Sequence, residues 1–340
     1  MSSAGTAPPR TFTDDHGQRR ACGSVHVRVR PCPSVGGPAV SRAIARAGSG
    51  ALLAAGAAVL IWGGTPIATR IAVDTIDPAM VGMLRTLLAA LLAALLAPLL
   101  LLALRLPVPA GDRTRPLLAF SGLCAFALFP VLFSIGIEYT TASHAGLILA
   151  MQPLFTALAA HLVEKSAPSW RWAAGAALAA AGTFALVHFR IGIAEGTEQS
   201  WIGDLLILVA GFLASIGYVG GGRAARRFPA LGVTLWGLVV GGVALLPLFA
   251  WRAGAVDWGA GTLSSWTSVV YLAFAVSSLG YLLWYWALAR GGIARIGTLQ
   301  FLQPVASLIL AVVILGEAMT LPLAACAAVV LAGTILAHRG

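Results

Sequence analysis

The feature that most constrains this chain is a succession of apolar runs, each about twenty residues long and separated by short polar breaks. A helix that crosses a bilayer needs about 20 mainly apolar residues. The breaks carry Asp, Arg, Pro or Gly, as in "DTIDP" and "ARGGIAR", and no run alternates with period two as a barrel strand would. The runs lie at about 50–73, 78–104, 116–137, 142–163, 172–189, 201–222, 229–250, 265–289, 294–316 and 319–337. They predict an all-α integral membrane protein with ten transmembrane helices.

Composition excludes a soluble globular protein. Hydrophobic residues make up 59% of the 340 residues and charged residues only 10%, whereas soluble domains carry roughly 25% charged residues. The formal net charge of +10 would indicate nucleic-acid binding in a soluble chain. Here the arginines lie between the apolar runs, so nucleic acid is not a predicted partner.

Motifs for metals, nucleotides and redox chemistry are missing from the sequence. None of the four cysteines forms a C-x-x-C pair, and the single lysine, Lys165, is not part of a phosphate-binding loop. All twelve acidic residues fall in the N-terminal segment, in breaks or near run ends, so proton coupling through a mid-span carboxylate is not indicated. His144 and His161 are expected to be interfacial or hydrogen-bonded structural residues, with a proton relay as the alternative. We predict no cofactor and no metal.

Residues 1–47 differ from the rest of the chain. They hold seven arginines with scattered Pro, Gly and Ser and show no apolar period. Such a segment cannot bury enough apolar surface to order itself, and it lacks the apolar middle of a signal peptide. We predict a disordered basic cytoplasmic tail, or an upstream start that is not the real one.

The distribution of Lys and Arg predicts the orientation. With a cytoplasmic N-terminus, the inner segments that flank the runs hold thirteen basic residues, and the outer ones hold only Arg190 and Arg252. Short cytoplasmic loops carry the excess of Lys and Arg. We therefore expect a multi-pass protein of the plasma (inner) membrane with both termini in the cytoplasm.

An internal repeat divides the apolar region. "GLILAMQP" begins at Gly146 and "GTLQFLQP" at Gly297, 151 residues later, and the same separation relates "GTFALVH" to "GTILAH". The chain is thus expected to hold two five-helix repeats, 50–189 and 201–338. Because five is odd, the second repeat enters the membrane from the opposite side. Inverted repeats of this kind typically place a solute site near the midplane, exposed to each side in turn.

Three segments carry a resemblance to a known family. "IWGGTPIATRIA" contains Trp62 and Arg70, "MLRTLLAALL" contains Arg85, and "LQPVASLILAVVILGEAMT" contains Pro304 and Glu317. Their order resembles the drug/metabolite transporter superfamily, in its ten-helix type with two EamA domains. The resemblance implies that both repeats are EamA-type domains and that the chain transports small metabolites or drugs.

Polar and aromatic side chains inside the runs are candidates for a solute cavity. Arg85 lies roughly 10 Å along its helix, where a charge is expected to face a cavity or a partner, although snorkelling to the surface is an alternative. Gln300 and Gln303 share a helix face, as do Tyr281 and Trp284, for which interfacial anchoring is the alternative. The candidate substrate-binding residues are Trp62, Arg85, Gln152, Pro153, Tyr281, Trp284, Gln300, Gln303 and Pro304.

These observations predict a secondary transporter of small organic metabolites or drugs that works by alternating access. Its expected partners are a small-molecule solute and the lipid bilayer, with a homodimer as an alternative to the monomer. A membrane-embedded enzyme is one competing reading, but it would need clustered His, Asp or Glu. A structural or regulatory membrane protein is another, and it would not need polar residues repeated at mid-span.

Overall fold

The computed structural model describes residues 38–103, 114–164, 169–188, 201–291, 296 and 298–338. The predicted tail lies outside these residues as far as residue 37. The chain divides into two compact units, Met1–Ala43 and Ile44–Gly340. The membrane-spanning helices and the candidate site belong to the second unit.

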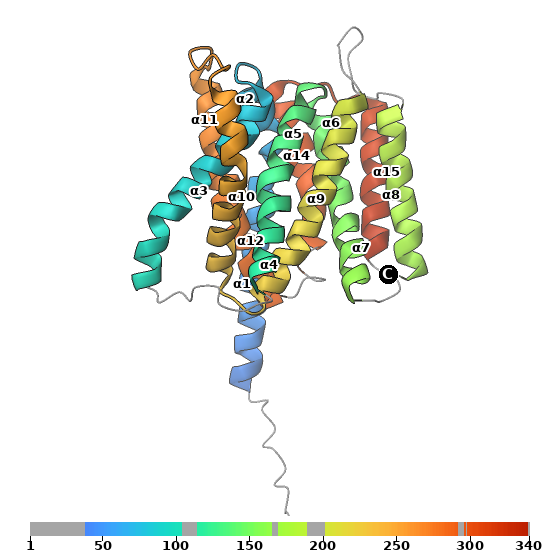
Figure 1. Ribbon diagram of the computed structural model, residues 1–340. Helices are drawn as coiled ribbons and strands as arrows, with labels where there is room; N and C mark the ends of the chain where they lie inside the picture. The colour runs from blue at the N-terminus through green and yellow to red at the C-terminus, as the bar shows by residue number, and fades with distance from the viewer. Residues whose placement is uncertain are drawn as a thin grey trace, which may run out of the picture. The chain divides into compact units, whose positions relative to one another are not determined.

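The described residues are helical apart from turns and short connections, and no strand occurs among them (Figure 1). The all-α prediction is therefore confirmed. The α-helices are α1 (Pro38–Gly63), α2 (Thr65–Val73), α3 (Pro78–Ala103), α4 (Thr114–Ser121), α5 (Phe129–Glu138), α6 (Ala142–Ile148), α7 (Gln152–Glu164), α8 (Trp170–His188), α9 (Trp201–Ala225), α10 (Ala230–Ala253), α11 (Leu263–Tyr271), α12 (Tyr281–Gly291), α14 (Leu302–Leu315) and α15 (Leu321–His338).

Within the described part of the chain, seven continuous helical segments are long and apolar enough to cross a membrane. They correspond to the first four predicted runs and to the sixth, seventh and eighth. The segments are Gly50–Val73, Pro78–Leu96, Thr114–Glu138, Ala142–Val163, Trp201–Ala225, Ala230–Ala253 and Leu263–Gly291. The other three runs contain α8, α14 and α15, of which α14 and α15 are shorter apolar helices. A multi-pass membrane protein is confirmed.

Four of these runs change helix type inside the membrane-spanning region. A π-helical segment interrupts the third run, η1 (Gly122–Leu128), and another interrupts the eighth, η3 (Leu272–Gly280). A 3-10 turn precedes the Gln-Pro pair in the fourth run, η2 (Leu149–Met151), and in the ninth, η4 (Thr298–Phe301). Such irregular turns leave some backbone groups outside the α-helical ladder. In lipid, these groups must be satisfied by other parts of the protein.

Side chains from distant helices donate to carbonyls of both π-helical segments. The Tyr281 hydroxyl donates to the carbonyl of Ala125 in η1 at 3.1 Å. The indole N–H of Trp62 donates to the carbonyl of Val276 in η3, also at 3.1 Å. Ala125 and Val276 are 151 residues apart, the separation of the two Gln-Pro pairs. Each half of the chain therefore supplies a donor to the irregular segment of the other.

Small residues allow α8 and α15 to lie side by side (Figure 1). A Cβ atom at Gly175 of α8 would collide with the backbone of Ala337, and one at Gly333 of α15 would collide with the backbone of Ala179. Helices in lipid associate through such close backbone approaches, because the surrounding acyl chains provide no hydrophobic drive between helices.

An ion pair fixes the turn between α2 and α3 to the end of α10. The Arg252 guanidinium donates to both carboxylate oxygens of Asp77, with distances of 3.0 Å from Nε and 2.5 Å from Nη2. Asp77 also accepts a hydrogen bond from the backbone N–H of Met80, at 3.0 Å, in the first turn of α3. Arg252 holds the pKa of Asp77 below its ordinary value of 3.8.

This ion pair predicts a pH-dependent contribution to stability. Because the folded-state pKa is the lower one, the carboxylate stabilises the fold above about pH 4 and loses that effect as pH falls through the folded pKa. We expect Asp77→Asn, which keeps an oxygen acceptor for α3, to lower the thermal midpoint in detergent at pH 7 by roughly 1–3 °C. The difference from the unsubstituted protein should shrink below about pH 4. An equal difference at pH 7 and pH 3 would contradict the assignment.

Candidate functional site

One cavity gathers polar and aromatic side chains from both halves of the chain. The described residues that line it are Trp62, Thr65, Arg85, Phe129, Gln152, Tyr218, Val276, Tyr281 and Gln303. Five of these, Trp62, Arg85, Gln152, Tyr281 and Gln303, are among the residues that the sequence singles out. The two glutamines of the Gln-Pro repeat thus line the same cavity.

Four other candidates do not line this cavity. Trp284 is buried and packs against the Trp62 ring, with 5.3 Å between centroids. Pro153 and Pro304 follow the two lining glutamines and do not themselves reach the wall. Gln300 is buried in η4, and its amide oxygen and nitrogen have no hydrogen-bond partner among the described residues.

Aromatic rings form one side of the cavity. Trp62 stacks on Tyr218 with 5.6 Å between centroids and an interplanar angle of 4°, and the Tyr281 ring meets Trp62 edge-on at 5.2 Å. These contacts bring together residues of α1, α9 and α12. The Trp62 and Tyr281 rings are also held by their hydrogen bonds to η3 and η1. The wall therefore has fixed ring positions before any solute arrives.

Four lining residues were not among the sequence predictions: Thr65, Phe129, Tyr218 and Val276. Tyr218 had the clearest available signal, because it is a lone aromatic residue in the glycine-rich stretch "GYVGGGR". One of those glycines, Gly221, lies against the Tyr285 ring, where a Cβ atom would come within 2.5 Å of the ring. The glycines thus make room for neighbouring rings.

Arg85 is fully buried and does not snorkel to the surface. Its Nε donates to the Ser277 hydroxyl at 3.2 Å, and its Cζ lies 5.7 Å from the centroid of the Phe129 ring. The two terminal nitrogens, Nη1 and Nη2, have no hydrogen-bond partner among the described residues. A guanidinium carries five N–H donors and stays charged in proteins, so most of its bonding capacity is unused.

The cavity is narrow in this structure. Its free space is comparable to the volume needed by about one water molecule. A metabolite can therefore occupy it only after the surrounding helices move apart.

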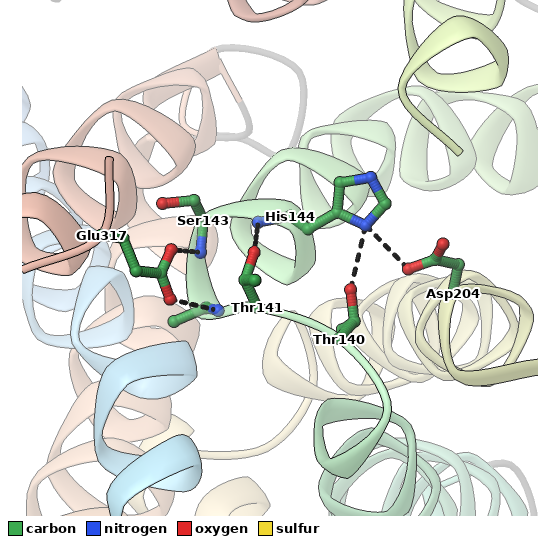
Figure 2. A network of polar contacts seen from close by, with 7 residues as sticks. Thr140, Thr141, Ser143, His144, Asp204 and Glu317 are labelled. Carbon is green, nitrogen blue, oxygen red and sulfur yellow. Dashed lines mark hydrogen bonds and ion pairs between the residues drawn. The ribbon is translucent and has the colours of Figure 1, made fainter. Parts of the chain in front are cut away.

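A carboxylate from the second half caps a helix of the first half, outside the cavity lining (Figure 2). Glu317 accepts hydrogen bonds from the backbone N–H groups of Ala142, at 2.8 Å, and Ser143, at 2.9 Å, in the first turn of α6. Gly316 has φ of 68° at the end of α14, and the Glu317 N–H bonds back to the Ala311 carbonyl at 3.3 Å. This glycine turn orients the glutamate.

A buried histidine–aspartate pair lies beside this cap (Figure 2). Nδ1 of His144 in α6 lies 2.8 Å from an oxygen of Asp204 in α9 and 2.9 Å from the Thr140 hydroxyl. The Thr141 hydroxyl accepts from the His144 backbone N–H at 3.1 Å. The sequence places Asp204 near a helix end, as the structure does, but it gives no sign that Asp204 and His144 are buried together.

A second polar contact joins the two halves of the chain. The Ser121 and Tyr285 hydroxyls are 3.0 Å apart and buried. Along the chain, Ser121 comes before the cavity residue Phe129 in the third run. The first turn of α6, which Glu317 caps, comes after the end of that run. The two polar contacts therefore lie on opposite sides of the cavity.

The Glu317 cap predicts a loss of stability on truncation. Glu317→Ala leaves two N–H groups of α6 without their acceptors, and we expect the thermal midpoint in detergent to fall by roughly 2–5 °C. Glu317→Gln keeps one oxygen acceptor but removes the negative charge at the helix N-terminus, so it should lose less. Glu138→Ala, which removes an exposed carboxylate, serves as the control. Equal effects of Glu317→Ala and Glu138→Ala would show that the cap contributes nothing.

Comparison with known proteins decides the family. The model of the EamA-like transporter family matches the chain twice, over residues 48–188 and 201–339. The chain belongs to the EamA-like transporter family. The resemblance seen in the sequence and the prediction of a transporter are both confirmed.

Several relatives of this EamA protein are named as transporters. The uncharacterized transporter YdeK of Bacillus subtilis is 33% identical over 76% of this chain and 86% of its own length. A probable terminal-alkyne amino-acid exporter of Streptantibioticus cattleyicolor is 28% identical over 60% and 67%, respectively. A probable amino-acid metabolite efflux pump of Salmonella typhimurium is 27% identical over 81% and 90%.

The EamA chain also superposes on a solved crystal structure. The TM-score is 0.60 at 21% sequence identity, covering 84% of this chain and 97% of the other. At this identity, the likeness supports the fold alone.

Proposed function

We propose that this EamA protein is a secondary transporter that moves small organic metabolites by alternating access between two inverted five-helix repeats, 50–189 and 201–338. The observation that carries the proposal is the shared cavity, whose wall contains Gln152 from the first repeat and Gln303 from the second. Inverted repeats place their solute site at such an interface.

The matched irregular segments support this two-repeat arrangement. The π-helical segments fall in the third and eighth runs, and the 3-10 turns fall in the fourth and ninth. In this arrangement, α8 is the fifth span, and α14 and α15 are the ninth and tenth. The cavity then lies where the third and fourth spans of one repeat approach their counterparts in the other.

The two polar contacts on opposite sides of the cavity provide a mechanism for alternating access. Opening one end would separate α6 from Glu317 and Asp204, while the contact between Ser121 and Tyr285 stays closed. Opening the other end would do the reverse. The present structure, with both contacts made, corresponds to the closed form between the two.

The names of the relatives guide the proposed solute class. An amino-acid exporter and an amino-acid metabolite efflux pump are both relatives of this chain, so we propose small metabolites of the amino-acid type as solutes. Transport is favoured over a membrane-embedded enzyme or a structural protein, since the family and relatives are named for transport. We place the protein in the plasma membrane with both termini in the cytoplasm.

Labelling of single cysteines tests the topology. In a background without the native cysteines, we expect Arg226→Cys, between α9 and α10, to react with a membrane-impermeant maleimide only from the cytoplasm. Asp74→Cys, between α2 and α3, should react only from outside, because basic residues concentrate in the cytoplasmic loops. Reaction of Arg226→Cys from outside would contradict the inverted arrangement.

Counterflow in proteoliposomes tests the site. We expect Gln303→Leu to reduce the apparent affinity for a labelled amino-acid mixture by roughly 5- to 150-fold, because a buried polar group of the solute would lose its hydrogen-bond partner. Val313→Leu, on the exposed face of the same helix, is the control. Unchanged transport per folded molecule in Gln303→Leu would remove Gln303 from the site.

A further inference from the structure

We propose that the cavity binds its solute by a carboxylate group held on the Arg85 guanidinium, so that the transported metabolites are organic carboxylates. This inference rests on the proposed transport function and names the chemical group that the site selects.

Charge in the cavity is unbalanced. Arg85 is the one charged side chain among the described residues that line it. A cation buried in a membrane protein is costly unless an opposite charge or good hydrogen bonds accompany it. Ser277 satisfies only Nε, and neither terminal nitrogen has a partner among the described residues. An anion in the cavity would supply the missing negative charge and the hydrogen-bond acceptors for Nη1 and Nη2.

The available donors match a carboxylate. With Nε occupied by Ser277, the guanidinium keeps its Nη1 and Nη2 end for a ligand. A planar guanidinium binds a carboxylate through two parallel N–H···O bonds, which are stronger than bonds between neutral groups. Gln152, which also lines the cavity, has a buried Nε2 without a partner among the described residues. It can donate to the same anion.

The other lining residues favour a single carboxylate attached to an apolar body. The rings of Trp62, Phe129, Tyr218 and Tyr281 offer apolar area next to Arg85. A phosphate monoester carries up to two negative charges and usually binds several cations or a helix N-terminus, whereas this wall offers one. The aromatic faces alone could attract an ammonium group, but Arg85 disfavours an amine that carries no carboxylate.

Matched solutes test the inference directly. We would compare 3-phenylpropionate, its amide 3-phenylpropionamide and the amine 3-phenylpropylamine, which share a body and differ in charge. Propionate and indole-3-propionate, each with its amide, extend the series to smaller and larger bodies. Affinity would be measured by thermal-shift titration in detergent, and counterflow would be measured in proteoliposomes, with inorganic phosphate as a competitor.

The unsubstituted protein should bind at least one carboxylate about tenfold or more tightly than its amide, since charge-assisted bonds are worth more than neutral ones. Arg85→Gln should bring this ratio close to one. Arg85→Lys keeps the positive charge but loses the planar guanidinium that can make two parallel hydrogen bonds. Its ratio should therefore lie between those of the unsubstituted protein and Arg85→Gln. The ratio is measured within one preparation, so it does not depend on how much of a variant folds.

Two further variants separate binding from folding. Ser277→Ala removes the partner of Nε but leaves the two terminal nitrogens, so the ratio should stay above that of Arg85→Gln. Arg226→Gln removes an exposed charge at the end of α9 and should leave the ratio unchanged. If Ser277→Ala abolished the ratio as fully as Arg85→Gln, Arg85 would be a structural residue and the inference would be wrong.

Other outcomes overturn the inference as well. Equal or tighter binding of the amides or the amine by the unsubstituted protein would exclude a carboxylate site, and so would displacement by phosphate at lower concentration than by any carboxylate. Transport without carboxylate preference would overturn this inference and leave the transporter function intact. Carboxylate binding at Arg85 without counterflow of any solute would instead contradict the transport function.

Discussion

Inside a bilayer, a backbone carbonyl that leaves the helical ladder has no water to bond to, and this constraint organises the centre of the molecule. The π-helical segments η1 and η3 depart from the α-helical ladder, and side chains of other helices donate to their carbonyls. Tyr281 reaches Ala125, and Trp62 reaches Val276. The same two aromatic residues then form part of the cavity wall. The same two side chains therefore bond the backbone of another helix and shape the site.

Among the described residues, Arg85 is the one charged side chain whose buried atoms lack hydrogen-bond partners. Other ionisable groups are paired: His144 with Asp204, and Glu317 with the first turn of α6. Some neutral polar atoms, such as those of the Gln300 amide, are also buried without a partner among the described residues, but a buried cation costs far more than a neutral group. At Arg85, only Nε is used, although the side chain is fully buried. Two N–H groups without hydrogen-bond acceptors add nothing to the stability of the fold. Proteins depart from such local rules mainly at functional sites. This contrast is the physical basis for assigning the ligand contact to Arg85.

The membrane-spanning character could be predicted from the sequence because length and apolar composition alone decide it. Five cavity residues could be predicted because a polar side chain in an apolar run needs a reason to be there. Which of these polar side chains reaches the cavity could not be predicted in the same way. Gln300 and Gln303 are separated by about 4.5–6 Å along a helix axis, depending on helix type, and only Gln303 reaches the small cavity.

Contacts between distant segments were also beyond the sequence. Nothing near Asp204 in the chain indicates His144, sixty positions earlier, and Tyr218 enters the site only because α9 packs against α1 and α12. The helix-type changes were equally hidden, because a π turn requires no particular residue and is set by the partners that its carbonyls find.

The crossed bonds to Ala125 and Val276 have a consequence for the fidelity of a carrier. Each bond has its donor in one half of the chain and its acceptor in the other. If the halves separated fully, both carbonyls would lose these partners, and the costs would add. In the proposed alternating-access cycle, rocking the halves about this pair would keep the bonds and expose one side at a time. The crossed bonds would thus act as a fulcrum, which allows exchange across the membrane while resisting a continuous leak.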